Sequence, residues 1–382
     1  MKKILLFIGV VVLTLTSCKD NYDFNPGFTV PTELSGPKSV TLDVTSTVPV
    51  VLSWSGGKAS DGGIVQYSVL FDKQGGDFSN PTATLPSDLG AEPQLTITQS
   101  QINIIARNAG IKPEQTGTLI WTVVASRGGD VQRCASTSAI EVTRGEGIDN
   151  LPSALFLYGS ATENGGQGGQ QFRKVSDGVY RIYTKLTAGN IEFRSSTSSD
   201  AFTYYIDQQN NDKLKEGPGT TTVDGKNDIS RITVDFNTMS MNIDNIGSSV
   251  RCIWGATFDN IAVLQYKGNG NFSGDGDIRF IQQSRPETNP PSWLSWVEER
   301  YYFIAKVNGA DTCWGRADDV SAERPVGGEP DSFYALHEFG WSQWDHLWKM
   351  KGSLDMSHAT ITIETNHNNL MIHTFTNITS IK

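Results

Sequence analysis

Short runs in which apolar and polar residues alternate are the feature that most limits how this chain can fold. They include "SVTLDV", "VPVVLSWS", "IVQYSVLFDK" and "GTLIWTVVAS", and clusters such as "GGKASDGG" separate them. A period of two places successive side chains on opposite faces of a β-strand, and Gly, Ser and Asp clusters mark turns. The sequence therefore predicts an all-β protein.

The spacing of the first strands predicts a β-sandwich of immunoglobulin or fibronectin type over residues 36–146. Trp54 and Trp121 fall in mid-strand positions, so we assign them to the core. One helix interrupts the strands at "TQSQINIIARNAG", where Thr98 or Ser100 can cap its first turn and Asn108-Ala109-Gly110 ends it.

The N-terminus has the form of a secretory signal. Lys2 and Lys3 precede an apolar run from Ile4 to Leu15, which is too short to span a bilayer. The following Leu15-Thr16-Ser17-Cys18 resembles a bacterial lipobox. We expect residues 1–17 to be a signal peptide, Cys18 to be diacylated and residues 18–35 to form a polar tether, with simple cleavage nearby as the alternative.

Charge and cysteine content narrow the possible partners. The chain has 31 Lys+Arg against 41 Asp+Glu, and loss of Lys2 and Lys3 with the signal leaves 29 − 41 = −12. This net negative charge argues against nucleic acid and anionic lipid as binding partners. Cys134, Cys252 and Cys313 remain after lipidation of Cys18, and this odd number in strand-like runs predicts buried free thiols.

A faint internal repeat follows the first domain. "ALFLYGSATENGG" parallels "VRCIWGATFDN", "GNIEFRSSTSSDAFTYY" parallels "RYYFIAKVNGADTCWG", and "ISRITVDFNTMSMNI" parallels "HATITIETNHNNLMIH". Three matched elements in one order predict two further β-sandwich modules, at 151–246 and 248–382.

The segment "EFGWSQWDHLWKM" places three tryptophans at a spacing that also fits one face of a helix. Alignment of the repeat instead places Trp348 at the start of an inward-facing strand, with Trp341 and Trp344 in the connection before it. Loops of this kind lie at the surface and carry function.

The last module is also where flat aromatic rings alternate with short polar residues, as a sugar-binding surface requires. Such rings cover the C–H face of a pyranose while polar neighbours bind its hydroxyl groups. The candidate carbohydrate-binding residues are Trp293, Trp296, Trp314, Arg316, Trp341, Gln343, Trp344 and Asp345, each aromatic having a place in the core as its alternative. The 151–246 module has no tryptophan, so we expect binding there, which would rest on Tyr204 and Tyr205, to be weak or absent.

Part of the chain resembles a known family. The positions that carry this resemblance run from "VLSWSGG" to "GTLIWTVVAS", and they are Trp54, Tyr67, Phe71, Asp72, Asp77, Phe78, Ser79, Asn80, Pro81, Trp121, Thr122 and Val123. This pattern resembles the N-terminal domain of the SusE/SusF group of surface glycan-binding lipoproteins from Bacteroidetes polysaccharide-utilisation systems. The strands that open the two later modules, Leu157–Ala161 and Ile253–Thr257, resemble the first strand of that group's binding modules but lack its aspartate after glycine.

The resemblance implies a surface-exposed, lipid-anchored protein of the outer membrane that binds a polysaccharide or oligosaccharide without catalysis. It further implies a spacer role for the first domain, and a TonB-dependent transporter and a SusD-like lipoprotein as partners. The first alternative is an adhesion or assembly lipoprotein that binds a protein.

The second alternative is a glycoside hydrolase, which needs two carboxylates across a cleft. Available carboxylates in the last module are Glu298, Glu299, Asp318, Asp319, Glu329 and Asp331. All five histidines lie in the last 46 residues, but no HExxH spacing occurs, so we expect no metal and no cofactor. The glycine-rich segment at 268–277 lacks the spacing of a calcium loop and predicts a hairpin turn.

Overall fold

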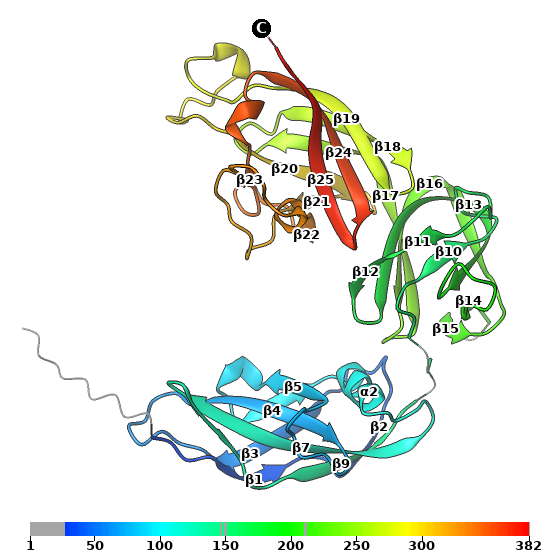
Figure 1. The fold of residues 1–382 in the computed structure, drawn as a ribbon, viewed down its shortest axis with the longest axis vertical. Coiled ribbons are helices and arrows are strands. Elements are labelled where there is room, and N and C mark those ends of the chain that lie inside the picture. The colour runs from blue at the N-terminus through cyan, green and yellow to red at the C-terminus, as the bar shows by residue number, and fades with distance from the viewer. Residues whose placement is uncertain (1–26, 146, 149–150, 210–211, 382) are drawn as a thin grey trace, which may run out of the picture. The chain divides into compact units, whose positions relative to one another are not determined.

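The computed structural model describes residues 27–145, 147–148, 151–209 and 212–381. Its contacts divide the chain into two compact units, Met1–Gly145 and Glu146–Lys382, which we describe separately (Figure 1). Nearly all regular structure in both is β-sheet, which confirms the all-β prediction. The signal peptide, Cys18 and the first part of the tether lie outside the described residues. Within the described part of the chain, no helix is long and apolar enough to cross a membrane.

The N-terminal unit consists of two sheets. One sheet has the order β1-β3-β6, and the other has the order β2-β9-β7-β4-β5 with β8 paired to β7. All pairings are antiparallel except that of β2 with β9. The strands are β1 (Pro31–Ser35), β2 (Ser39–Thr41), β3 (Val50–Gly56), β4 (Gln66–Lys73), β5 (Ala83–Pro86), β6 (Gln94–Ile97), β7 (Thr116–Arg127), β8 (Asp130–Arg133) and β9 (Ser138–Thr143).

The core of this unit lies where the inner faces of the two sheets meet. Trp54 of β3 and Trp121 of β7 are both buried there, as predicted, and the Trp54 ring makes an edge contact with Tyr67 of β4 at 5.6 Å. The predicted helix is α2 (Gln99–Asn108), whose amphipathic sequence buries Ile102 and Ile105 in the same core. Thr98 caps it, because its side chain accepts a hydrogen bond from the backbone N–H of Gln101.

The predicted tether, residues 18–35, extends too far along the chain. Residues Pro31–Ser35 form β1, which pairs with β3, and Phe28 bridges Ala59. The sequence "PTELS" has only one large apolar residue, Leu34, so its alternation is too weak to indicate a strand. The folded N-terminal unit therefore begins before residue 36.

The C-terminal unit is built on one continuous network of antiparallel strands. Its main path has the order β11-β10-β13-β16-β17-β18-β19-β24-β25, and shorter strands pair with β13 and β20. The strands are β10 (Phe156–Tyr158), β11 (Gln170–Gln171), β12 (Arg173–Ser176), β13 (Val179–Arg194), β14 (Thr203–Asp207), β15 (Lys213–Glu216), β16 (Thr221–Asp235), β17 (Ser240–Trp254), β18 (Asn260–Gly268), β19 (Asn271–Ile278), β20 (Arg300–Val307), β21 (Ala310–Gly315), β22 (His337–Phe339), β23 (Trp348–Lys349), β24 (Ser357–His367) and β25 (Leu370–Ser380).

Short 3₁₀ helices and tight turns complete both units. The 3₁₀ helices are η1 (Asp88–Gly90), η2 (Pro286–Thr288), η3 (Asp331–Tyr334) and η4 (Gly352–Leu354). The turn between β20 and β21 is Asn308-Gly309, with φ angles of 50° and 84°. Two positive φ angles are the requirement of the two-residue hairpin turn that matches strand twist, and Asn-Gly is its preferred sequence. In the glycine-rich segment at 268–277, Asn269-Gly270 likewise forms the turn between β18 and β19, and the residues from Asn271 onward belong to β19.

Strand β17 crosses the boundary expected between the two later modules. Its first part pairs with β16 up to Ile246, and its second part pairs with β20 from Ile246 onward and with β18 from Ser249 onward. No linker therefore separates 151–246 from 248–382, and the division of this unit into two modules stays a prediction. The two halves share part of their pairing pattern, since β10 pairs with β13 as β17 pairs with β20, and β13 pairs with β14 as β20 pairs with β21.

Three hydrophobic clusters fill the described part of the C-terminal unit, and Tyr183 joins the largest of them from β13. This residue of β13 packs with the cluster formed by β17–β25, and its ring makes an edge contact with Trp314 at 5.7 Å. Trp348 is fully buried in that cluster, as predicted. His373 beside it is also fully buried, and this burial lowers its pKa to about 3. Cys134, Cys252 and Cys313 are buried free thiols, as the sequence predicts.

Candidate functional site

Three connections meet at one end of the C-terminal sheet. They are residues 255–259 after β17, residues 279–299 before β20 and residues 340–347 before β23. The backbone N–H of Gly255 donates to the carbonyl of Arg300 at 2.9 Å, and the side-chain amide of Gln343 donates to the carbonyl of Gly255 at 3.3 Å. Gly255 permits this close approach, because a Cβ atom there would lie 2.4 Å from Leu347 Cδ2.

The connection before β20 turns two tryptophans outward around one buried residue. Leu294 is 1% exposed, and the side-chain amide of Gln283 donates to the carbonyls of Pro291 at 2.7 Å and Leu294 at 3.1 Å. With the backbone held in this way, Trp293 and Trp296 are 50% and 47% exposed. Large apolar side chains left in water on a well-packed loop are typical of a binding surface.

The connection before β23 exposes Trp344 next to buried core residues, just as the connection before β20 exposes Trp293 and Trp296 next to Leu294. The helical alternative for this segment is wrong, since the chain leaves β22 at Phe339, turns, and enters β23 at Trp348. The rings of Phe339 and His346 stack at 3.6 Å and fix the two ends of the connection. Leu347 and Trp348 are buried, whereas Trp344 is 44% exposed.

Trp293, Trp296 and Trp344 form what we call the tryptophan cluster. The Trp293 ring centroid lies 6.0 Å from that of Trp296 and 5.8 Å from that of Trp344. The guanidinium of Arg300 lies 5.0 Å from the Trp344 ring and 5.9 Å from the Trp296 ring, at cation–π distance. Three exposed rings from two connections thus lie together, and one cation lies over two of them.

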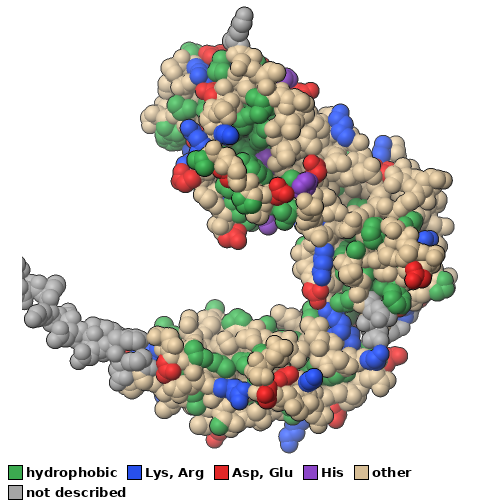
Figure 2. Space-filling view, viewed as in Figure 1, with side chains coloured by type: hydrophobic (Ala, Val, Ile, Leu, Met, Phe, Trp, Pro, Cys, Tyr) green, Lys and Arg blue, Asp and Glu red, His purple; other side chains and the backbone are tan. Residues whose placement is uncertain are grey.

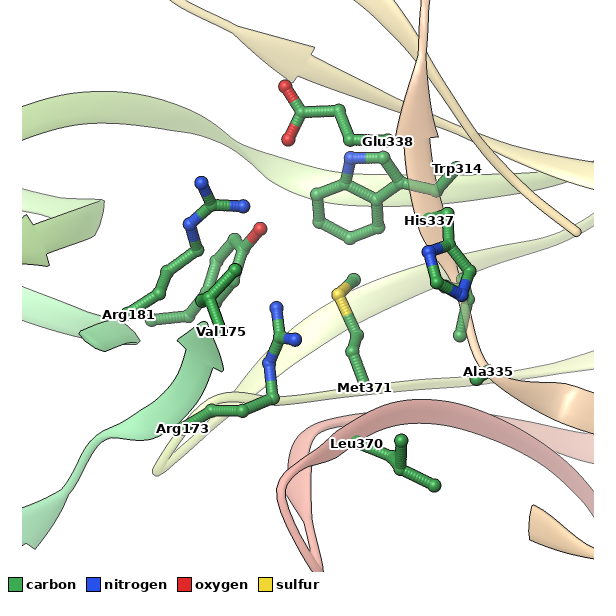
Figure 3. A pocket seen from close by; sticks show the side chains of 11 residues that line it. Arg173, Val175, Arg181, Trp314, Ala335, His337, Glu338, Leu370 and Met371 are labelled. Atoms are coloured by element: carbon green, nitrogen blue, oxygen red, sulfur yellow. The ribbon is translucent and has the colours of Figure 1, made fainter. Parts of the chain in front are cut away.

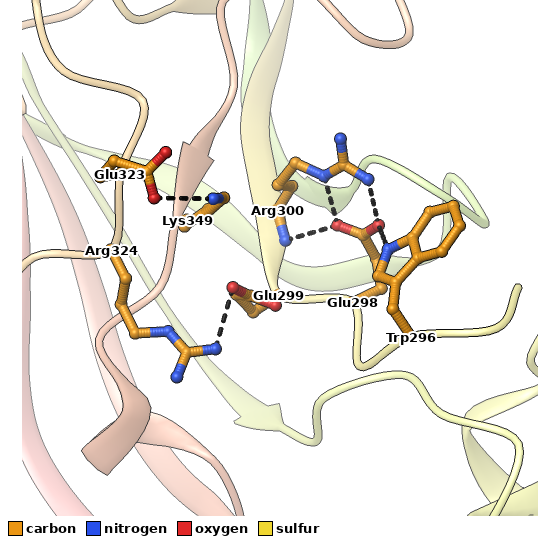
Figure 4. Close-up of polar contacts among 7 residues, drawn as sticks. All are labelled: Trp296, Glu298, Glu299, Arg300, Glu323, Arg324 and Lys349. Atoms are coloured by element: carbon orange, nitrogen blue, oxygen red, sulfur yellow. Dashed lines mark hydrogen bonds and ion pairs between the residues drawn. The ribbon is translucent and has the colours of Figure 1, made fainter. Parts of the chain in front are cut away.

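Glu298 positions this cation (Figure 4). Its carboxylate is 1% exposed and accepts hydrogen bonds from Arg300 Nε at 2.7 Å, from the Arg300 backbone N–H at 2.9 Å and from Trp296 Nε1 at 2.8 Å. Burial acts to raise the pKa of Glu298, but the hydrogen bonds from Arg300 and Trp296 outweigh it and hold the pKa below its ordinary value. Glu298 is therefore ionised at neutral pH and fixes Arg300 and Trp296 together.

Trp341 lies apart from the tryptophan cluster in a second aromatic pair. Its ring centroid is 5.9 Å from that of Phe258, in the connection after β17, and the two side chains are 54% and 40% exposed. The two aromatic groups come from connections that touch at Gly255.

Several residues named from the sequence serve the fold instead. Trp314 is 1% exposed, because β21 packs its side chain against Tyr183, so a surface role for it is wrong. Tyr204 is likewise fully buried and offers no surface for the 151–246 module. Arg316 donates to the carbonyls of Leu347, Ala317 and Val320.

The remaining polar candidates lie within the connection before β23. Gln343 holds Gly255 in the way described above. Asp345 is exposed, and its carboxylate accepts a hydrogen bond from Ser342 Oγ at 2.9 Å while its backbone N–H donates back to that oxygen. One oxygen of Asp345 thus remains available to a ligand beside Trp344.

The carboxylates considered for glycoside hydrolysis are mostly engaged with basic or backbone groups. Glu298 pairs with Arg300, Glu299 accepts from Arg324 at 2.9 Å (Figure 4), and Glu329 accepts from the backbone of Val326 and Gly327. A general acid needs a raised pKa, whereas the pKa values of Glu298 and Glu329 are lowered. Within the described ranges, no three His, Cys, Asp or Glu side chains converge as metal ligands.

Three further residues contribute to this site and were not assigned to it from the sequence. They are Arg300, Glu298 and Phe258. Glu298 stood only among possible hydrolytic carboxylates, and Arg300 follows it in "WVEERY" without a motif. One sequence signal could have found Glu298 and Arg300. They follow Trp296 at two and four residues, which allows a charged side chain to lie over the ring.

The fold and the site together define an all-β protein whose C-terminal unit carries an exposed aromatic surface on loops at one sheet end. Residues 19–124 match the model of the SusE outer membrane protein family. This match confirms the resemblance in the N-terminal part of the chain, and it ends before the loops that carry the tryptophan cluster. Among solved structures, SusF from Bacteroides thetaiotaomicron is 12% identical, with a TM-score of 0.27 over 90% of this chain and 76% of that chain. No curated protein sequence matches the chain.

Proposed function

We propose that this chain is a non-catalytic surface protein that binds a polysaccharide or oligosaccharide through the tryptophan cluster. The observation that carries the proposal is three tryptophans, each close to half exposed, held by buried neighbours around Arg300. A rigid aromatic ring loses little conformational entropy on binding and covers the C–H face of a pyranose. Arg300 and Asp345 supply a donor and an acceptor for the hydroxyl groups at the edge of that face.

The charge distribution agrees with an uncharged or locally anionic partner. Lys, Arg, Asp and Glu side chains are scattered over the face shown in Figure 2, without a continuous basic surface. With a net charge of −10 for the whole chain, long-range attraction to nucleic acid or anionic lipid is absent. Contact by stacking and local hydrogen bonds suits a glycan better.

We further propose that Cys18 anchors the protein to the outer membrane by its acyl chains. We expect Cys18→Ala to leave the membrane fraction and remain folded, because acyl chains provide the membrane affinity and the described domains begin only after the segment that carries them. Fractionation followed by a salt wash measures this. A variant that still sediments with outer membranes after the wash contradicts the lipid anchor.

The resemblance of the first domain supports two neighbours at the membrane, a TonB-dependent transporter and a SusD-like lipoprotein. In this arrangement the N-terminal unit acts as a spacer, and the C-terminal unit presents the tryptophan cluster to the medium. The glycan is then held close to the transporter that imports it.

Native affinity electrophoresis against a panel of neutral and acidic polysaccharides tests the proposal. We expect retardation by at least one polysaccharide and no release of reducing ends from it. Release of reducing ends indicates a glycoside hydrolase instead. Failure of every polysaccharide to retard the protein contradicts glycan binding and favours the adhesion or assembly alternative.

A further inference from the structure

A second concave site lies within the C-terminal unit, away from the tryptophan cluster. It is a pocket of about 130 Å³ enclosed by β12 and β13 on one side and by β21, β22 and the start of β25 on the other (Figure 3). At roughly 30 Å³ for each water in the liquid, this space suits a group the size of a carboxylate or sulfate with part of the atom framework that bears it. The pocket is too small for several sugar rings.

Two arginines line this pocket without an acidic partner. Arg173 and Arg181 come from neighbouring strands, and neither forms an ion pair with any residue that the structure describes. Arg181 donates from Nε to Thr233 Oγ1 at 3.2 Å, which leaves its terminal nitrogens available. In Figure 3 the Arg173 guanidinium lies between the side chains of Val175 and Met371.

The acid at the pocket wall is paired with another base, which it shares with a second acid. Glu338 accepts from Arg231, and Arg231 also donates to Asp244 from Nε at 2.9 Å and from Nη2 at 2.7 Å. These three residues carry one net negative charge, which the two positive charges of Arg173 and Arg181 exceed. Burial and the nearby charge of Arg173 lower the pKa of His337, so this ring is neutral at neutral pH and adds a neutral polar wall.

Two buried donors at this pocket also lack partners. Arg173 Nε and Trp314 Nε1 are shielded from solvent and make no hydrogen bond to the described residues. Leaving a buried donor unpaired is destabilising, and leaving a buried charge unpaired is more so. An arginine pair beside an aromatic wall is therefore stabilised by an oxyanion, which a guanidinium binds through two parallel hydrogen bonds.

We propose that this pocket binds an anionic oxygen group on a sugar, either the carboxylate of a hexuronate or a sulfate ester, with Arg173 and Arg181 as its cationic ligands. That the group is borne by a sugar rests on the proposed function, whereas recognition of an oxyanion rests on the pocket alone. The apolar edges of Trp314, Tyr183 and Met371 line the space beside the two cations and accommodate ring C–H groups.

Calorimetric titration of the full mature chain with four probes tests this inference. The probes are galacturonate, galactose 6-sulfate, inorganic sulfate and galactose as the neutral control. We expect at least one anionic sugar to bind about tenfold or more tightly than galactose, and Arg173→Gln to abolish this preference because a single charged hydrogen-bonding pair supplies about that factor. Preference for galacturonate identifies the carboxylate as the ligand, and preference for the two sulfates identifies the sulfate ester.

Arg279→Gln is the matched control, because it removes the same charge from a residue that pairs with Asp277 outside this pocket. Circular dichroism verifies that Arg173→Gln is folded, and Arg173→Lys provides a second variant that keeps the charge but loses the planar fork. Equal binding of galacturonate, galactose 6-sulfate and galactose, or equal loss in the Arg173 and Arg279 variants, overturns the inference.

The two proposals fail in different ways. If a polysaccharide retards the protein and Arg173→Gln does not change anionic-sugar binding, the pocket inference fails and the glycan surface stands. If no polysaccharide retards the protein but galacturonate binding depends on Arg173, the proposed function fails and the pocket stands as an independent anion site.

Discussion

Replacing Trp348 by alanine lowers the free energy of unfolding of the C-terminal unit by about 3–5 kcal/mol, the usual range for truncating a fully buried aromatic side chain. Trp348 is 0% exposed, its ring stacks on Tyr301 at 5.8 Å, and it makes an edge contact with His373 at 4.5 Å. Its Nε1 donates to the carbonyl of Phe333 at 2.8 Å. Truncation removes this packing, leaves a cavity and leaves a buried carbonyl without its donor.

Urea unfolding followed by far-ultraviolet circular dichroism measures this loss, with the N-terminal unit as a separate transition. Trp344→Ala is the control, because it changes the same residue type four positions earlier in the chain. Its side chain is 44% exposed, so we expect a change of about 1 kcal/mol or less. Equal destabilisation by the two variants contradicts the assignment of Trp344 to the surface.

The alternation of apolar and polar residues was sufficient to predict the β-architecture. Strand β3 buries Val50, Leu52 and Trp54 at alternate positions, and β24 buries Ala359, Ile361 and Ile363 in the same way. Where alternation is weak, as in β1, the prediction failed because cross-strand pairing with β3 supplies the stability that the local sequence lacks.

Trp314 shows why part of the site could not be predicted. Its neighbours Arg316 and Asp318 indicate a surface loop, and the sequence does not indicate that Tyr183 packs against its ring from β13. Contacts between residues so far apart in the chain depend on strand order, which the local pattern does not specify. The same limit applies to β17, whose passage between the two halves depends on pairings with β16, β18 and β20.

For Trp341, Trp344 and Trp348 the repeat was more informative than the spacing. Their spacing fits a helix, but alignment with the first copy placed Trp348 at a strand start and the other two before it. The structure has this arrangement. Spacing over eight residues is too short to distinguish one helical face from a loop followed by a strand.

We expect Trp293→Ala/Trp344→Ala to weaken glycan binding by about 2 kcal/mol or more, roughly 30-fold in the dissociation constant. Stacking of a flat ligand on one exposed aromatic side chain contributes about 1–3 kcal/mol, as judged from base stacking. The two rings lie 5.8 Å apart, so their contributions are coupled and the two single variants will not add to the double variant. Both side chains are about half exposed, so the fold survives their loss.

Phe202→Ala is the matched control for this variant, since Phe202 is 50% exposed in the same unit but lies in the connection before β14. Arg300→Lys is a further comparison, because it removes the guanidinium that lies over Trp344 and Trp296 but keeps a positive charge beside the buried Glu298 carboxylate. We expect it to weaken binding less than the double tryptophan variant does.

The most direct measurement is calorimetric titration of the full mature chain with the polysaccharide that retards it most strongly, compared with the double tryptophan variant and Phe202→Ala at one pH and salt concentration. The surface assigned to the tryptophan cluster predicts that the double variant loses roughly 30-fold or more in affinity while Phe202→Ala binds as the unaltered chain does. Equal affinity of the double variant and the unaltered chain, with both folded, contradicts the assignment of glycan binding to Trp293 and Trp344.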